Sequence, residues 1–367
     1  MNFFQQKNKR LFLVVVVAYF GLTAGWAQTG DSTEKLLADA GAALSSDDLS
    51  RAGAVLRNVL KTAPRNVKAH TLAGALADRQ NDLRAAEKHF AIAAGLQPKS
   101  SETRNNYGAI LFRVGRAAEA AKEFEASLLI NPGQRSAQIN LAQIYFARGT
   151  PADLRAAEML FEKAFAAAPD VEIARALVVI ALRLGDTERA ARDYRQYSAL
   201  GKDSVLPVTA RIELGAALLE SNLIAEAVAE LEPAFAAAPN DANAVVLMAR
   251  AYLGRKDIKN AGRTLEAAVS RGVDNAEIYA ALADVYEAGG YYENAIPAMR
   301  LAIERDSRSE PYRFRYGLML VDTKAPAAAV IRLTEAIKDF PASARLWLGL
   351  GIAQYSDSKT VEAQQSL

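Results

Sequence analysis

The chain has 367 residues, 51% of them hydrophobic and 23% charged, a balance that excludes an intrinsically disordered protein. Its formal net charge of +2, with both signs interspersed, gives no electrostatic footprint for nucleic acid. Cysteine is absent from the sequence, which excludes disulfides, thiolate metal sites and cysteine nucleophiles, and the two histidines, His70 and His89, leave little material for histidine chemistry.

The first 27 residues have the pattern of a secretory signal peptide. Basic residues between positions 7 and 10 precede an apolar run, residues 11–22, and small residues then permit cleavage after Ala27. The alternative is an uncleaved membrane anchor, because residues 11–27 reach the lower limit of a membrane span. We therefore expect an exported protein, periplasmic if the cell is bacterial, with residues 28–32 as a short polar lead-in.

An alanine recurs along the rest of the chain at intervals of 33 to 37 residues, most often 34, and a large apolar residue stands four positions after it. We number each unit so that this alanine is position 20. The recurring alanines are Ala52, Ala86, Ala120, Ala157, Ala190, Ala227, Ala261, Ala295, Ala329 and Ala363. A fixed period near 34 is typical of stacked helical hairpins.

Other positions of the unit support two packed helices. Position 8 is glycine or alanine in nine of ten units, and position 27 is small in most of them. Small residues on facing helices let the helix axes approach, and the large residue at position 24 fills the space beside them. A proline at position 32 in six units predicts where the second helix ends.

With this pattern the chain resembles the tetratricopeptide repeat family. The closest copies of the family pattern are Tyr107-Gly108, Ala120, Phe124 and Pro132, and Trp347, Leu350-Gly351 and Ala363. The resemblance covers residues 33–367 and implies an all-α fold, a right-handed α-solenoid of nine full helix-turn-helix repeats and a partial tenth. Because the family consists chiefly of protein-binding scaffolds, it also implies that the chain is not an enzyme and uses no cofactor or metal.

Three local departures from the pattern carry predictions. The fourth unit has three extra residues, which we expect between its helices around residues 149–151. An irregular link at residues 201–207 is a candidate bend. Pro233 and Pro297 fall inside second helices, where the lost hydrogen bond predicts a kink.

In the tetratricopeptide family the first helices line a concave groove with positions 2, 5, 9 and 12. The resemblance therefore implies that a partner protein or peptide segment binds there. The predicted contact residues are Phe112, Phe146, Leu253, Glu277, Asp284, Glu287, Phe314, Leu318 and Tyr355. The three acids of the eighth unit repel one another unless something basic answers them. The competing interpretation is that these side chains pack against neighbouring helices.

Two further sets of polar residues have structural and functional interpretations. Asn106 and Asn140 share position 6, where the family can hold the backbone of a bound peptide, but asparagine is also simply common there. His70 at position 4 is interpreted as a packed or half-exposed structural side chain and His89 as a surface residue, and neither belongs to an acid–base constellation.

The partial tenth unit, residues 344–367, leaves two alternatives open. One is that the chain is the repeat portion of a longer enzyme or envelope assembly machine whose active part follows Leu367. The other is self-association through an uncapped C-terminal end, which predicts an oligomer that deletion of residues 344–367 abolishes. Contact with a membrane is expected only through an uncleaved N-terminal anchor.

Overall fold

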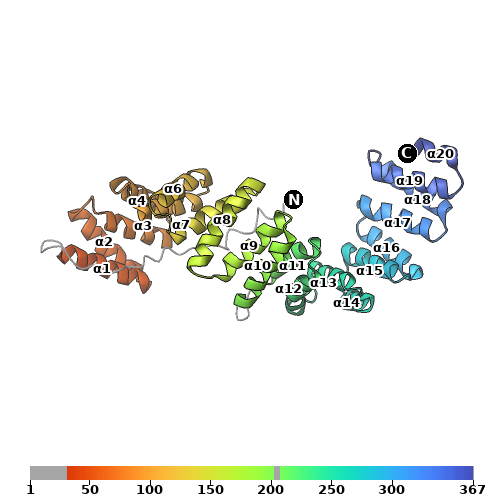
Figure 1. Ribbon diagram of the computed structural model, residues 1–367, viewed down its shortest axis with the longest axis horizontal. Helices are drawn as coiled ribbons and strands as arrows, with labels where there is room; N and C mark the ends of the chain where they lie inside the picture. Colours follow the sequence, from red (N-terminus) through yellow and green to blue (C-terminus); the bar gives the residue numbers. More distant parts are fainter. Residues whose placement is uncertain (1–30, 202–206, 367) are drawn as a thin grey trace. The chain divides into compact units, whose positions relative to one another are not determined.

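A computed structural model describes residues 31–201 and 207–366, and within these ranges the chain forms α-helices and no strand (Figure 1). The all-α prediction is confirmed. No helix in these ranges is long and apolar enough to cross a membrane. The predicted signal peptide, residues 1–27, lies outside the described residues and stays a prediction, which N-terminal sequencing of the mature chain would check.

The helices form hairpins, each made of a first and a second helix. The first eight helices are α1 (Asp31–Ser45), α2 (Leu49–Thr62), α3 (Val67–Arg79), α4 (Leu83–Leu96), α5 (Ser101–Arg113), α6 (Ala117–Ile130), α7 (Arg135–Arg148) and α8 (Pro151–Ala167). The next six are α9 (Val171–Arg183), α10 (Thr187–Leu200), α11 (Val208–Glu220), α12 (Ile224–Ala237), α13 (Ala242–Gly254) and α14 (Ile258–Ser270). The last six are α15 (Ala276–Ala288), α16 (Tyr292–Arg305), α17 (Glu310–Asp322), α18 (Pro326–Asp339), α19 (Ala344–Ser356) and α20 (Thr360–Ser366).

The helices group into two compact units, and the boundary falls between Ile180 and Ala181, inside α9. We describe each unit by itself. The boundary does not coincide with the link at 201–207, most of which lies outside the described residues, so the bend there stays a prediction.

Short polar side chains set the helix starts. Asp48, Asn66 and Asp82 each accept a hydrogen bond from the backbone N–H three residues later, at 2.8–3.0 Å, which satisfies a donor that the helix itself leaves free. One residue between the two helices of a hairpin has positive φ, for example Asn81 at 59° and Gly115 at 86°. A left-handed residue ends the first helix, so the chain turns back within a few residues.

In five repeats a donor at position 4 ties the repeat to the one before it. The side chain at this position donates a hydrogen bond to the carbonyl of the residue six positions earlier, at 2.7–3.1 Å. The five donors are His70, Arg104, Gln138, Arg313 and Trp347, whose acceptor carbonyls belong to Pro64, Pro98, Pro132, Ser307 and Pro341. Different side chains serve because each carries an N–H that reaches the same carbonyl.

The core confirms the predicted packing of small against large residues. A Cβ placed on Gly108 would lie 2.7 Å from a ring carbon of Phe124, and one on Gly317 would lie 2.5 Å from Leu333. Phe124 and Leu333 are fully buried on the second helices α6 and α18. In these two repeats the close approach of the side chain at position 24 favours glycine at position 8.

The three extra residues of the fourth unit lengthen its second helix. The prediction that they lie between the two helices of this unit is wrong. Gly149 ends α7 with φ of 72°, the Thr150 hydroxyl accepts from the Asp153 N–H at 3.1 Å, and Pro151 is the first residue of α8. Proline suits the first position of a helix because its missing N–H would be unpaired there. As a result α8 has 17 residues, whereas α2, α4 and α6 have 14.

The two prolines inside second helices do not stop those helices. Pro233 lies in α12 and Pro297 in α16, and both helices continue beyond them. Each proline removes one backbone hydrogen bond to the carbonyl four residues earlier. The kink at either position stays a prediction.

The two histidines, which the sequence analysis treated separately, form a pair between α3 and α4. Their Nδ1 atoms lie 3.0 Å apart, and Nε2 of the buried His70 lies 2.9 Å from the Pro64 carbonyl. A carbonyl can only accept, so Nε2 of His70 carries the proton and its Nδ1 accepts from His89. The interpretation of His89 as a surface residue holds only in part, because the side chain has intermediate exposure and its Nδ1 contacts His70.

We expect the first unit to lose stability as the pH falls from 7.5 to 5.5. Burial, followed by the neighbouring His70 and Lys88, lowers the pKa of His89. The unfolded chain then binds more protons than the folded chain, so stability drops as the pH falls through the unfolded histidine pKa near 6.5. Thermal unfolding of the wild type at both pH values measures the drop.

The control for this prediction is His89→Asn, which keeps a donor near the Nδ1 position but does not titrate. Its melting temperature should change less between pH 7.5 and 5.5 than that of the wild type. An equal change in both proteins would show that the histidine pair is not the source of the pH dependence.

Candidate functional site

The nine predicted contact residues fall in both units, and we describe each set within its own unit. Phe112 and Phe146 lie on α5 and α7 of the first unit, and the other seven lie on α13, α15, α17 and α19 of the second. All nine are on first helices, as the position numbering predicts. Each set is treated below as a candidate surface of its own unit.

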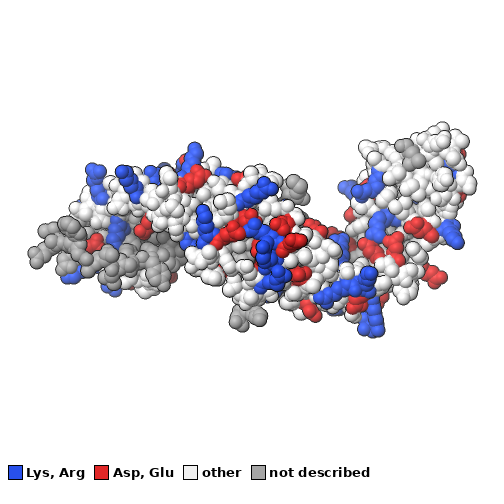
Figure 2. All heavy atoms as spheres, in the orientation of Figure 1, with Lys and Arg blue, Asp and Glu red and all other residues white. Residues whose placement is uncertain are grey.

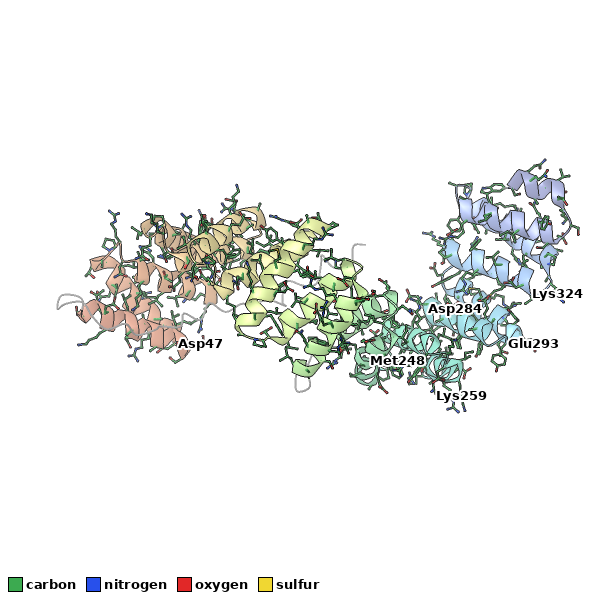
Figure 3. The ribbon with its side chains drawn as sticks, viewed as in Figure 1. Asp47, Met248, Lys259, Asp284, Glu293 and Lys324 are labelled. Atoms are coloured by element: carbon green, nitrogen blue, oxygen red, sulfur yellow. The ribbon has the colours of Figure 1, made fainter. Side chains whose placement is uncertain are left out.

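The acids of the eighth repeat find a basic partner within the chain. Arg315 on α17 forms salt bridges with both Asp284 and Glu287 on α15, the second through Nη2 at 2.7 Å. Figure 3 marks Asp284 on α15. Burial raises the pKa of Asp284, and the adjacent Arg315 partly offsets this effect. Only Glu277 of the three is exposed, and Arg315 offsets one of the three negative charges from inside the chain.

The apolar residues among the predicted contacts of the second unit differ in their exposure to solvent. Leu253 is half-buried in the core around α13 and α15. Phe314 packs on α19, where a Cβ on Gly349 would lie 3.0 Å from its ring, and the Arg345 guanidinium lies 5.8 Å from the ring centroid. Leu318 is half-buried, and only Tyr355 is freely accessible, with 70% of its surface exposed. The packing interpretation thus accounts for Leu253 and Phe314.

In the first unit, buried side-chain amides collect on α5 and α7. We call Asn105, Asn106, Asn140 and Gln143 the amide face. Nδ2 of Asn140 donates to Oδ1 of Asn105 at 3.2 Å, a bond between positions 6 and 5 of successive repeats. All four side chains are buried although they lie on first helices at groove positions or next to them.

Two donors of the amide face have no hydrogen-bond partner in the described chain. They are Nδ2 of Asn106 and Nε2 of Gln143, on side chains only 2% and 9% exposed. A buried donor without an acceptor costs roughly 1–3 kcal/mol, so an acceptor that reached either donor would remove this cost. Two aromatic residues, Phe112 (37% exposed) and the half-buried Phe146, lie on the same two helices.

The described residues were compared with the polar features that the sequence analysis considered. Across residues 31–201 and 207–366 there is no group of three or more His, Asp or Glu that could hold a metal ion. The Gly289-Gly290 pair forms the turn before α16, as expected, with φ of 74° at Gly290. Basic and acidic side chains are interspersed on the face drawn in Figure 2.

Comparison with family models identifies the repeats. Models described as tetratricopeptide repeat match residues 71–135, 218–285 and 276–308, which lie in both units. Together with the helical hairpins and their spacing, these matches show that the chain belongs to the tetratricopeptide repeat family. The fold is accordingly an α-solenoid. No curated protein matches the chain.

Several solved structures resemble the chain. The pilF protein of Pseudomonas aeruginosa has a TM-score of 0.50 and 16% identity, covering 58% of this chain and 95% of that one. PilW, described as a widely conserved type IV pilus biogenesis factor, has a TM-score of 0.49 and 21% identity over 59% and 98% of the two chains. YrrB, described as a TPR protein with an unusual peptide-binding site, has a TM-score of 0.45 and 18% identity, covering 53% of this chain and 97% of that one. At these identities the similarity supports the fold alone.

Sequence reasoning missed two residues that matter for these surfaces. Arg315 lies at position 6, outside the positions considered for the groove, and nothing in its repeat marks it as the partner of Asp284. Glu230 on α12 is 4% exposed and binds Arg211 at 3.0 Å. A recurring signal existed, since His70 with His89, Arg104 with Glu123 and Arg211 with Glu230 are all 19 residues apart.

Proposed function

We propose that this tetratricopeptide repeat protein is a non-catalytic scaffold that binds an extended segment of a partner protein on the amide face of its first unit. Tetratricopeptide repeat proteins bind peptides or protein partners, which is the coarse function that the family membership supports. The observation that carries the finer proposal is the pair of buried, unpartnered donors of Asn106 and Gln143.

The chemistry of the face favours an extended backbone over other ligands. An extended segment offers carbonyl oxygens at regular spacing, and side-chain amides bind them without regard to sequence. Each such bond contributes about 0.5–1.5 kcal/mol net, and more where it satisfies a donor that was buried and unpaired. Phe112 and Phe146 would contact an apolar side chain of the segment and supply selectivity.

The proposed test combines crosslinking with isosteric substitution. A photoreactive residue at Phe112 should give a discrete adduct with another protein in cells, and one at the exposed Lys122 on α6 should not. The double variant Asn106→Leu with Gln143→Met removes the donors and keeps a similar branched or linear side-chain shape. We expect it to reduce the adduct about tenfold or more, because two hydrogen bonds are lost.

Stability separates a binding role from a structural one. Because the donors are unpaired in the free protein, the double variant should unfold at the same or a higher denaturant concentration than the wild type. A loss of more than about 1 kcal/mol in unfolding free energy would mean that the amides hold the fold. An adduct of equal strength at Phe112 and Lys122, or one insensitive to the double variant, would refute the proposal.

A further inference from the structure

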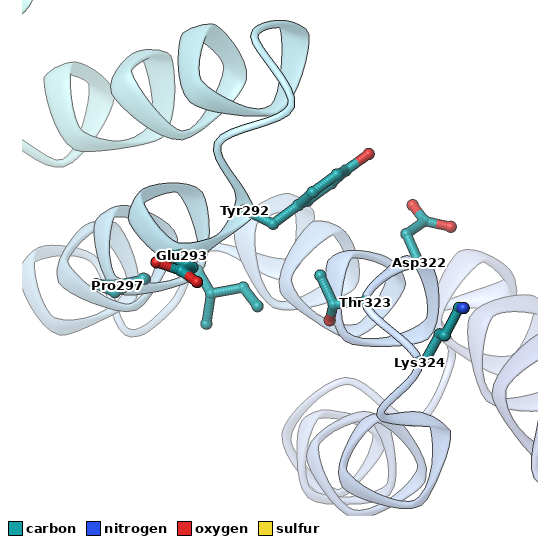
Figure 4. A pocket seen from close by; sticks show the side chains of 7 residues that line it. Tyr292, Glu293, Pro297, Asp322, Thr323 and Lys324 are labelled. Atoms are coloured by element: carbon teal, nitrogen blue, oxygen red, sulfur yellow. The ribbon is translucent and has the colours of Figure 1, made fainter.

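An open cleft of about 650 Å³ lies between α16 and the turn that follows α17 (Figure 4). Tyr292, Glu293, Ile296 and Pro297 of α16 line one side, and residues 322–324 line the other. In the view of Figure 4, Glu293 and Pro297 lie opposite Asp322 and Lys324. The cleft belongs to the second unit and shares no residue with the amide face.

Pro297 gives the cleft a backbone acceptor. It lies inside α16 and has no N–H, so the carbonyl of Glu293, four residues earlier, lacks its helical donor. Both residues line the cleft, so the turn of α16 that the proline interrupts borders it. A donor from outside the chain would restore the missing bond.

The charges of the cleft favour a cation. Glu293 and Asp322 are exposed and form no salt bridge within the described residues, whereas nearby Glu287, Glu310 and Asp339 are all paired with arginines. Lys324 offsets one of the two acids, which leaves one net negative charge at the cleft. The C-terminal end of α17, which leads into the same turn, adds partial negative charge.

The wall of the cleft is apolar enough to hold a carbon chain. The ring of Tyr292 is partly exposed, and Ile296 and Pro297 continue the surface along α16. A tyrosine ring also attracts a cation placed over its face. Two exposed acids alone would be an ordinary solvated surface, but here they flank an apolar cleft beside the helical turn that Pro297 interrupts.

We propose that this cleft binds an arginine side chain presented by a partner protein. A guanidinium has several N–H donors in a planar fork, so it can satisfy the Glu293 carbonyl and a carboxylate together, and it stacks on aromatic rings. Its aliphatic stem fits the surface of Tyr292 and Ile296. Lysine offers a single compact charge and should bind less well. The inference concerns a second interaction surface and does not depend on the amide face.

The test uses a capped Gly-Arg-Gly peptide as the probe and the full chain as the target. Because the chain has no cysteine, a fluorine label on Asn294→Cys, beside Glu293, reports from one position only. We expect a saturable shift with arginine, a weaker one with the lysine peptide, and none with the citrulline peptide, which has the same shape without the charge. Equal shifts with arginine and citrulline, or no saturation up to about 50 mM, would overturn the proposal.

Three substitutions locate the binding. Glu293→Gln should weaken arginine binding about five- to tenfold, whereas Glu304→Gln, an exposed acid of the same helix outside the cleft, should leave it unchanged. Lys324→Asn removes the competing charge and suits the left-handed backbone at this position, where φ is 61°, so binding should strengthen. Unchanged affinity in both Glu293→Gln and Lys324→Asn would place the peptide elsewhere and reject the cleft.

Discussion

Replacing Glu230 by alanine is expected to destabilise the second unit by about 3–5 kcal/mol, the cost of breaking a buried ion pair. Glu230 on α12 accepts hydrogen bonds from the hydroxyls of Tyr194 at 2.9 Å and Tyr197 at 3.3 Å, both on α10. It also binds the guanidinium of Arg211 on α11 at 3.0 Å. One carboxylate therefore joins three helices.

The size of the effect follows from what the substitution leaves behind. Alanine removes both acceptor oxygens, so Arg211 and the two buried tyrosine hydroxyls lose their partner in a poorly solvated place. Burial raises the pKa of Tyr194, and the Glu230 carboxylate raises it further, so this phenol stays a hydrogen-bond donor. The tyrosine cannot ionise to compensate for the lost acceptor.

Chemical denaturation followed by circular dichroism measures this loss. Glu232→Ala is the matched control, since Glu232 is exposed on the same helix and should change stability by less than about 0.5 kcal/mol. Glu230→Gln keeps one acceptor oxygen and loses the charge. Its loss of unfolding free energy should therefore lie between those of Glu230→Ala and Glu232→Ala, at about 1–3 kcal/mol. A cost below about 1 kcal/mol for Glu230→Ala would show that the cluster does not hold the helices together.

Phe124→Ala is expected to cost about 3–5 kcal/mol in the first unit, because it removes a fully buried ring from the cluster of Leu111, Leu141 and Ile144. Gly108→Ala should cost about 1–3 kcal/mol for the opposite reason. Its new Cβ would lie 2.7 Å from the Phe124 ring, so the core would be overpacked.

The two substitutions should interact because they act on the same space. In the double variant the methyl group at position 108 points into the volume that the ring vacates. The combined cost should therefore be at least about 1 kcal/mol smaller than the sum of the single costs. Additive costs would mean that Gly108 and Phe124 are not in contact.

Gly95→Ala is the control for glycine substitution as such. A Cβ at this position of α4 meets nothing within 4 Å, so only helix propensity changes. The variant should be more stable by about 0.5–1 kcal/mol. If Gly108→Ala lowers the unfolding free energy and Gly95→Ala raises it, the cost at Gly108 comes from close packing and not from a general effect of replacing glycine in a helix.

The sequence predicted the hairpins well because their defining contacts are local and repeated. Gly108 and Phe124 are 16 residues apart in one hairpin, and the same relation recurs at Gly317 and Leu333. A contact at constant spacing leaves a periodic trace in the chain. The prediction failed at Thr150 and Pro151, where a local cap moved the extra residues into α8.

The candidate sites were predicted less well. The positions facing the groove are periodic, so Phe112, Phe146 and Tyr355 lie on first helices as expected. What each residue contacts is not periodic. Arg315 neutralises Asp284 and Glu287 because a single long side chain on the next first helix reaches both acids.

The sequence by itself determined the family, the helical hairpins and the small-against-large core, since the same spacing specifies these features in every repeat. Only the tertiary structure decided which polar groups are paired. It joined His70 to His89 and buried Glu230 among two tyrosines and an arginine. It also left the donors of Asn106 and Gln143 without partners. The physical reason is that a hydrogen bond or ion pair forms or fails when the distance between side chains of different helices changes by a few tenths of an ångström. No residue pattern records that distance.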